Sequence, residues 1–293
     1  MNSSTERLAL GTVQFGLPYG VANQTGQVLR LEAKEMLELA RNSGMKMLDT
    51  AKGYGDSEEC LGELGSRGFD IVTKFPVTLD GCTDIGGLIQ AEVEDSCARL
   101  KVGKIYGLLL HHSASLLGSN GKELVRALED MKHKGLVEKV GISIYSPDEL
   151  ELVYQSFFPD IVQAPFNLID RSLHTSGWMD RLKERGVEIH IRSVFLQGLL
   201  LMDREDIPSK FEPWQELWNT WHEWLKERDR SALQICLAFA LHFPEIDRIL
   251  VGADCSSQLQ EIIDGAKAGY TGDFPEIESD DQSLINPSLW NEQ

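Results

Sequence analysis

The apolar residues of this chain fall into short continuous runs, and amphipathic stretches separate one run from the next. Short apolar runs rich in leucine or β-branched residues are typical of strands that are buried on both faces. This pattern predicts strands at residues 8–12, 45–50, 70–74, 105–111, 139–143, 161–165, 188–193 and 248–252. Apolar positions at helical spacing predict helices at 31–43, 57–66, 86–100, 121–134, 147–156, 171–185, 231–243 and 256–268, with Ser57 capping the second.

Eight strands that each precede a helix predict a (β/α)8 TIM barrel, with residues 1–293 forming a single domain. A doubly wound parallel sheet is the main competing fold. Such a sheet normally carries a G-x-G-x-x-G turn after its first strand. Gly11, Gly16 and Gly20 do not form that motif and do not open a helix. The glycine pattern therefore favours the barrel.

Two segments interrupt the repeat of strands and helices. Residues 203–230 contain Trp214, Trp218, Trp221 and Trp224, and the first three share one face of a helix. We expect a Trp-rich helical insert that packs on the barrel wall, with a lid or a dimer contact as the alternative. The acidic tail at 271–293 is expected to be a loose terminus or to fold over the barrel mouth.

Composition restricts the partners and the compartment. The formal net charge of −18 argues against nucleic acid and against anionic membranes, which would repel the chain. No apolar run reaches the roughly 18 residues of a membrane span, and the N-terminus lacks a signal-peptide layout. Five scattered cysteines without a CxxC motif are typical of free thiols in a reducing compartment. We expect a cytoplasmic protein that is a monomer or a weak homodimer.

Four polar residues mark the candidate active site. Asp49 ends the second predicted strand, Tyr54 lies in the loop after it, Lys74 ends the third strand and His111 ends the fourth. Chemistry in a barrel takes place at the carboxyl ends of the strands, so these side chains should share one mouth. Each residue alone has a plain structural explanation, but their occurrence at three consecutive strand ends favours catalysis.

Carbonyl reduction suits these residue types. Hydride addition to a carbonyl leaves negative charge on oxygen, and that oxygen must be protonated as the charge forms. A tyrosine has a pKa of about 10 and is a weak acid, but an ammonium group beside it favours the phenolate. We therefore expect Tyr54 to donate the proton, Lys74 to lower its pKa and Asp49 to hold Lys74. His111 would orient the carbonyl oxygen.

The sequence resembles the aldo-keto reductases from Leu10 to Glu261. The most specific match is the segment Asp49-Thr50-Ala51-x-x-Tyr54-Gly55-x-Ser57-Glu58. The resemblance implies a barrel that uses NADP or NAD without a Rossmann domain, with Tyr54 as general acid. His111 is preferred over His112 because it follows the Leu-Leu-Leu run, as in the family. The implied activity is reduction of an aldehyde or ketone, or oxidation of the matching alcohol or sugar.

The resemblance also implies a set of cofactor-binding residues. Ser143 and Gln163 match positions that bind the nicotinamide carboxamide, although Ile144 stands where the family has asparagine. Arg192 stands where an aromatic usually stacks on the nicotinamide, so its ligand would be the pyrophosphate or an acidic substrate. The whole implied set is Gly11, Thr12, Asp49, Ser143, Gln163, Arg192, Ser193, Gln197, Gly198, Gly252, Gln258 and Glu261.

The residues after the last predicted strand do not fix a preference between NADP and NAD. Gly252 and Gln258 replace the Lys and Arg with which strict NADPH enzymes of the family bind the 2′-phosphate. Losing two cations predicts relaxed specificity or NAD use, unless Lys210 or Arg228 takes their place.

Val13, where relatives carry a bulky aromatic, predicts a mouth open to a polar substrate such as a sugar.

Two other functions compete with reduction. The barrel could bind cofactor without catalysis, as a redox-sensing or partner-binding subunit, but the complete set of four catalytic positions argues against it. A metal-dependent hydrolase could use His111 and His112. Adjacent residues on a strand point to opposite sides and no supporting carboxylate motif is evident, so we expect no metal.

Overall fold

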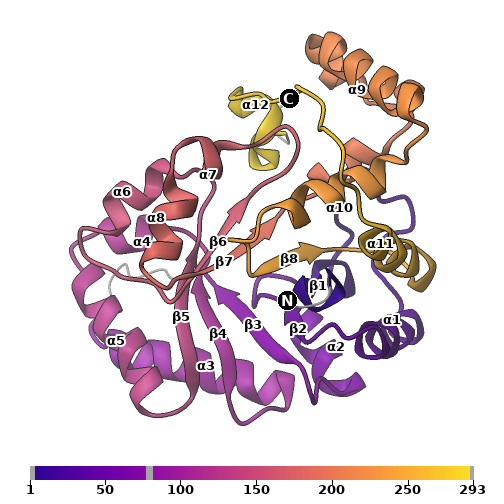
Figure 1. Cartoon of the computed structure of the whole chain (residues 1–293). Helices are drawn as coiled ribbons and strands as arrows, with labels where there is room; N and C mark the ends of the chain where they lie inside the picture. Colours follow the sequence, from indigo (N-terminus) through magenta and orange to yellow (C-terminus); the bar gives the residue numbers. More distant parts are fainter. Residues whose placement is uncertain (1–3, 77–81, 291–293) are drawn as a thin grey trace.

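The computed structural model describes residues 4–76 and 82–290 and contains a closed barrel of eight parallel strands (Figure 1). Each strand pairs with the next one in the sequence, and β8 pairs with β1. The fold predicted from the sequence is therefore confirmed. The strands are β1 Leu8–Gly11, β2 Met47–Asp49, β3 Asp70–Phe75, β4 Ile105–Leu110, β5 Val137–Ser143, β6 Ile161–Pro165, β7 Glu188–Arg192 and β8 Arg248–Val251.

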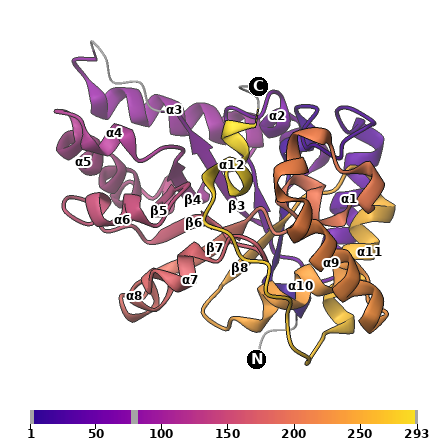
Figure 2. The same cartoon turned by 90° about the horizontal axis from the view of Figure 1, so that it is seen from above.

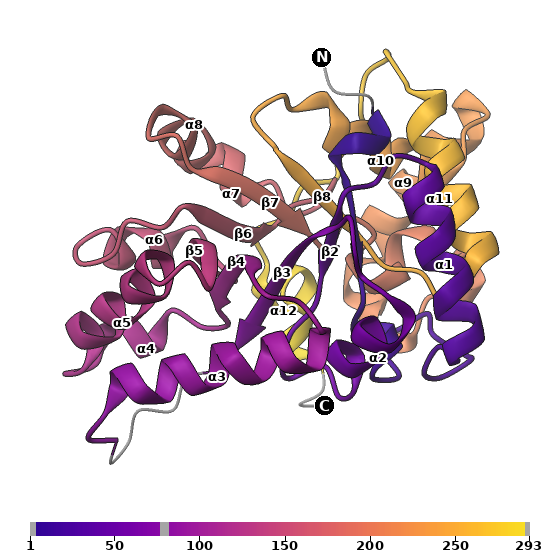
Figure 3. The same cartoon turned by 90° about the horizontal axis from the view of Figure 1, so that it is seen from below.

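Helices cover the outside of the barrel, as the view from below in Figure 3 shows. No helix within the described ranges is both long enough and apolar enough to cross a bilayer. The helices are α1 Arg30–Asn42, α2 Ser57–Leu64, α3 Ile85–Leu100, α4 Ala114–Leu117, α5 Gly121–His133, α6 Asp148–Val153, α7 Ser172–Thr175, α8 Trp178–Glu184, α9 Gln215–Arg228, α10 Ala232–His242, α11 Ser256–Ala268 and α12 Gln282–Ile285.

The strands are buried on both faces, which explains why they read as continuous apolar runs. Alternate strand residues fill the barrel interior, where they form a separate apolar cluster: Ala9, Met47, Val72, Leu109, Ile161 and Leu250. The residues between them pack outward against the helices. Gly141 on β5 makes room for this packing, because a Cβ there would lie 2.2 Å from the Ile161 carbonyl oxygen.

Some element boundaries differ from the predicted ones. The helix predicted at 171–185 is divided into α7 and α8 because Gly177, between them, has a φ of +74°. Strand β4 ends at Leu110, so His111 is the first residue of the following loop. Strand β7 ends at Arg192, which places Ser193 in the loop as well.

The insert at 203–230 contains two 3-10 turns, Arg204–Asp206 and Ser209–Trp214, before α9. Three tryptophans of α9 are buried, namely Trp218, Trp221 and Trp224. The Trp221 indole donates a hydrogen bond to the Leu200 carbonyl at 3.1 Å, in the segment that follows β7. Trp221 thus holds α9 to a loop at the barrel mouth.

The tail crosses the same end of the barrel. The amide of Ser279 donates to the Ile169 carbonyl at 2.9 Å, in the loop after β6. Leu284 and Ile285 of α12 are buried, and Trp290 packs edge-on against Phe211 of the insert at 4.9 Å. Figures 1 and 2 show α12 above the carboxyl ends of the strands. Residues 271–290 are therefore packed against the barrel, whereas 291–293 lie outside the described residues.

Candidate active site

A buried ion pair lies at the mouth of the barrel. Lys74 Nζ donates to Asp49 Oδ1 at 2.6 Å and to the Thr50 carbonyl at 2.8 Å, and Lys74 is 1 % exposed. Burial alone would lower the pKa of Lys74, but Asp49 and the Tyr54 phenol outweigh it, so the pKa is raised. The other Asp49 oxygen accepts from Gln163 Nε2 at 2.8 Å. Lys74 is therefore held charged and fixed in one position.

Tyr54 faces this ion pair. Lys74 Nζ lies 5.1 Å from the centre of the Tyr54 ring, and the ring meets His111 edge-on at 6.0 Å. Two glycines allow the loops to approach: a Cβ on Gly16 would lie 1.8 Å from the Tyr54 carbonyl oxygen. Gly55 has a φ of +56°, and its Cβ would lie 2.3 Å from the Gly16 carbonyl oxygen. This loop contact therefore requires glycine at positions 16 and 55.

Ser57 and Glu58 hold the Tyr54 loop in place and do not face the mouth. Asp56 occupies the N-cap of α2, so the prediction that Ser57 caps the helix is wrong. The Ser57 hydroxyl donates to the Thr12 carbonyl at 2.8 Å, which ties the helix to the end of β1. Glu58 is buried and accepts from Thr73 Oγ1 at 2.6 Å. The second half of the sequence motif is therefore structural.

His111 lies beside Tyr54 as a neutral imidazole. Burial, then the charges of Lys74, His112 and Arg192, lower its pKa to about 4. The rings of His111 and His112 are stacked 5.0 Å apart, so the expectation that they point to opposite sides is wrong. The strand ends before them, and alternation applies only within a strand. Among the described residues, no group of three or more His, Cys, Asp or Glu side chains is placed to hold a metal.

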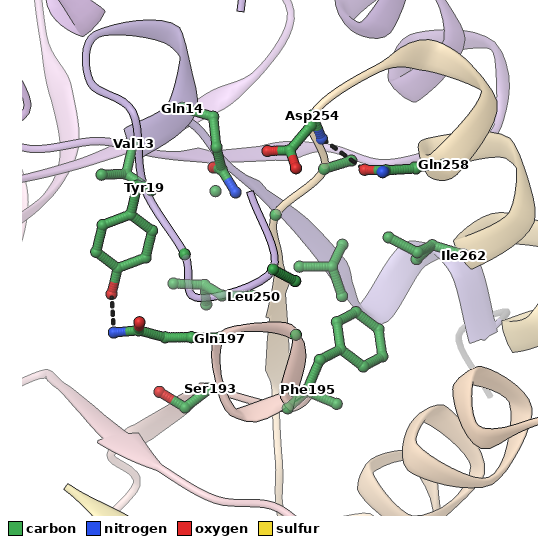
Figure 4. Close-up of a pocket in the computed structure, with 18 of the residues that line it drawn as sticks. Val13, Gln14, Tyr19, Ser193, Phe195, Gln197, Leu250, Asp254, Gln258 and Ile262 are labelled. Atoms are coloured by element: carbon green, nitrogen blue, oxygen red, sulfur yellow. Dashed lines mark hydrogen bonds between the residues drawn. The ribbon is translucent and has the colours of Figure 1, made fainter. Parts of the chain in front are cut away.

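A cavity of about 390 Å³ has Tyr54 in its lining. Figure 4 shows part of this cavity. The lining comes mostly from the ends of β1, β2, β7 and β8 and the segments after them, and Gln163 adds to it from within β6. The described lining does not include Lys74, His111 or Ser143, although Ser143 does end β5. The predicted residues that line the cavity are Gly11, Thr12, Asp49, Tyr54, Gln163, Arg192, Ser193, Gln197, Gly198, Gly252, Gln258 and Glu261.

Two buried amide oxygens in this lining have no hydrogen-bond partner. Gln163 Oε1 and Gln14 Oε1 are both unsatisfied, and a buried acceptor without a donor costs roughly 1–3 kcal/mol. A ligand that brings an amide N–H or a hydroxyl would satisfy them. Gly252 leaves room for the Gln14 amide, because a Cβ there would lie 2.6 Å from Gln14 Nε2. These donors and acceptors fit a nicotinamide nucleotide.

The loop after β7 has an unusual backbone. Ser193, Leu196 and Gln197 have φ values of 62°, 48° and 54°, a region that residues other than glycine seldom adopt. The loop also meets the segment after β1, since Gln197 Nε2 donates to the Tyr19 hydroxyl at 3.2 Å. Figure 4 shows this bond at the cavity. Non-glycine residues in this region cluster at ligand sites.

The segment after β8 is acidic. Asn23 Nδ2 donates to Asp254 Oδ1 at 2.9 Å, and the Asp254 amide donates to Gln258 Oε1 at 2.8 Å. Burial raises the pKa of Asp254, although the bond from Asn23 opposes the shift. Arg192 is the only Lys or Arg in the described part of the lining.

Neither candidate for the missing cations reaches the cavity. Arg228 pairs with Asp273 at 2.9 Å, and Lys210 donates to the Trp290 carbonyl at 3.4 Å.

Among the lining residues that were not predicted from the sequence are three polar ones, Gln14, Tyr19 and Asn23. They lie between β1 and α1, where no periodicity is present to interpret. The only available signal was the pair Gly16 and Gly20, which marks a loop that approaches other backbone closely.

Comparisons with known proteins agree on one family. The sequence pattern of the Aldo/keto reductase family matches residues 7–274. The chain is 28% identical over 259 residues to YqkF, an uncharacterised oxidoreductase of Bacillus subtilis, covering 81% of this chain and 83% of that protein. It is 25% identical over 313 residues to the L-glyceraldehyde 3-phosphate reductase of Escherichia coli, covering 93% and 90%. An aldo-keto reductase structure from Bacillus halodurans, in its holo form, superposes with a TM-score of 0.73 at 19% identity, covering 90% and 88%.

Proposed function

The chain belongs to the aldo/keto reductase family and is an NAD(P)H-dependent reductase, and on that premise we propose that it reduces an aldehyde or ketone with Tyr54 as the proton donor. The observation that carries the proposal is the cluster of Tyr54, Lys74, Asp49 and His111 beside a cavity with unsatisfied amide oxygens. The alcohol or sugar product would be oxidised by the same residues in reverse.

The proposed roles follow from charge and position. A bound nicotinamide supplies the hydride that adds to the carbonyl carbon. Tyr54 donates its phenolic proton to the carbonyl oxygen, and Lys74 stabilises the phenolate that remains. Neutral His111 is a poor acid, so it donates a hydrogen bond to the same oxygen and orients it. Asp49 keeps Lys74 charged and in place.

The cofactor would lie along the cavity from β6 to β8. Gln163 would bind the carboxamide, because it has the unsatisfied oxygen for its N–H. Ser143 is the second predicted contact; it ends β5 and is not in the described lining. The loop from Ser193 to Gly198 would hold the pyrophosphate, since successive left-handed residues turn backbone amides toward an anion. The remaining predicted contacts are Gly11, Thr12, Asp49, Arg192, Gly252, Gln258 and Glu261.

We propose that NAD(H) is preferred over NADP(H). The segment after β8 presents Asp254 and Glu261 to the cavity and no Lys or Arg among its described residues. A dianionic 2′-phosphate would face these carboxylates without a counter-ion, whereas ribose hydroxyls could donate to Asp254. A hydrogen bond from a ribose hydroxyl to a carboxylate contributes roughly 1.5–3 kcal/mol and NADPH would lose it, which predicts at least tenfold tighter binding of NADH than of NADPH. Titration of the protein with both nucleotides, followed by fluorescence, measures the ratio, and equal affinities would contradict the preference.

The main test combines turnover with cofactor binding. NADH oxidation is measured with a panel of aldehydes for the wild type, for Tyr54→Phe and for Tyr19→Phe, a second tyrosine of the same cavity. Tyr54→Phe should lose about 100-fold or more in kcat while binding NADH normally, because general acid catalysis contributes roughly that much. Tyr19→Phe should stay within a few fold. Unchanged kcat in Tyr54→Phe would overturn the assignment, and cofactor binding without any turnover in the wild type would favour a non-catalytic barrel.

A further inference from the structure

Arg192 is a cation in the cavity that forms no ion pair with a described carboxylate, although its charge opposes the rise that burial produces in the pKa of Asp170. Its Nη2 donates to the Ile144 carbonyl at 2.9 Å, and its Nη1 donates weakly to Ser193 Oγ at 3.4 Å. No ion pair within the described residues includes it, although the chain as a whole carries a net charge of −18. Lys74, by contrast, is neutralised by Asp49. Arg192 therefore keeps guanidinium donors that no described carboxylate occupies.

The guanidinium lies toward the reacting side of the cavity. It stacks over the Tyr145 ring at 4.7 Å, and Tyr145 stacks on His112 at 6.1 Å. His112 in turn stacks on His111, whose ring meets Tyr54. A continuous row of rings thus connects Arg192 with the proposed proton donor. The bond to Ile144 directs the side chain across β6 toward the loop after β5, away from β8 and its acidic residues.

The charge of Arg192 reaches the groups around Tyr54. After burial, Lys74 and His112, it is a further cause of the lowered pKa of His111. The same charge opposes the rise that burial produces in the pKa of Tyr19. A substrate held between these residues would lie in the field of Arg192, a cation whose charge also acts on the buried Asp170.

We propose that Arg192 binds an anionic group, a carboxylate or a phosphate, on the carbonyl substrate, and that the enzyme acts on acidic aldehydes or ketones. This inference rests on the proposed function. A guanidinium carries five N–H donors in a planar fork, and the bonds to Ile144 and Ser193 use only part of them. Its flat face is fixed by Tyr145, so the remaining donors are presented in one orientation. Charged hydrogen bonds of this kind contribute roughly 1.5–3 kcal/mol, which corresponds to a 10- to 150-fold change in KM.

The decisive experiment uses pairs of aldehydes that differ in charge. The holoenzyme with NADH is tested on succinic semialdehyde against butanal, and on glyceraldehyde 3-phosphate against glyceraldehyde. Arg192→Gln should raise KM at least tenfold for the charged member of a pair and less than threefold for the neutral one. Arg192→Lys should recover part of the difference, because it keeps the charge and loses the fork. Arg228→Gln on α9 removes the same charge outside the cavity and should leave both values unchanged.

Cofactor affinity separates the two anions that Arg192 could bind. If the pyrophosphate were its ligand, Arg192→Gln would weaken NADH binding tenfold or more and would affect both members of each pair equally, which would overturn the proposal. Failure of the proposed function has a different signature. No aldehyde would then oxidise NADH with any variant, while succinate would still bind to the wild-type protein and not to Arg192→Gln. Succinate that binds both proteins equally would also overturn the proposal.

Discussion

Lys74 Nζ lies 2.6 Å from Asp49 Oδ1, and both side chains are almost wholly removed from solvent. The pair joins the ends of β2 and β3, and Tyr54 lies in the loop between them. The position of the Tyr54 loop and the positive charge beside Tyr54 therefore both depend on the buried ion pair of Lys74 and Asp49. Its disruption should affect folding and catalysis together.

Asp49→Asn is expected to destabilise the fold by about 3–5 kcal/mol, because it leaves Lys74 buried without its counter-charge. Equilibrium unfolding in urea measures this loss. The double variant Asp49→Asn/Lys74→Met should recover much of the stability and none of the activity. Additive losses in the double variant would show that the two side chains are not coupled.

His111 should not titrate in the range where an ordinary histidine does. Its pKa is lowered to about 4, so kcat/KM should show no inflection from this residue between about pH 5 and 8. The neutral form favours folding: its contribution is complete above the unfolded pKa of about 6.5 and is lost as pH falls toward 4. The check is a pH profile of the wild type and of His111→Gln. An inflection near 6.5 that disappears in the variant would contradict the assignment.

A charge network near the amino ends of the strands should stabilise the barrel without affecting chemistry. Glu188 accepts from Lys139 at 2.5 Å and from the Tyr106 hydroxyl at 2.8 Å. Burial would raise the pKa of Glu188, but hydrogen bonds from His190, Lys139 and Tyr106 lower it to about 2.

This network gives a defined dependence on pH. The depressed pKa adds on the order of 2–3 kcal/mol, complete above about pH 4.5 and lost as pH falls toward 2. Glu188→Gln should remove it, with kcat unchanged at a temperature where the variant is folded. Equal stabilities of wild type and variant at pH 7 would refute this account.

Gly55→Ala should impair catalysis through the Tyr54 loop. The new Cβ would lie 2.3 Å from the Gly16 carbonyl oxygen, and the residue has a φ of +56°. Gly135→Ala is the matched control, since φ there is +73° and nothing lies within 4 Å of the Cβ. Both variants should lose roughly 1 kcal/mol from the backbone conformation. Only Gly55→Ala should lose more stability than that and also lose kcat, as thermal melts and steady-state rates will measure.

Most of the fold could be predicted because strand burial leaves a direct mark on the sequence. Residues such as Ala9 and Leu10 face the interior and the helices in turn, so every strand reads as an apolar run. The break at Gly177 was missed because a helical pattern continues across it, and one positive φ ends the helix without changing polarity. Strand ends were uncertain by a residue or two, which placed His111 on β4 instead of in the loop.

The sequence by itself determined the barrel and the four candidate catalytic residues, because parallel strands bring their carboxyl ends together whatever the loops do. Only the tertiary structure decided which groups surround Tyr54. The stacking of His111 on His112, the position of Arg192 over Tyr145 and the unsatisfied oxygen of Gln14 all arise between or within loops. Loop residues follow no hydrophobic period, so their neighbours are set by contacts between distant segments that no local pattern records.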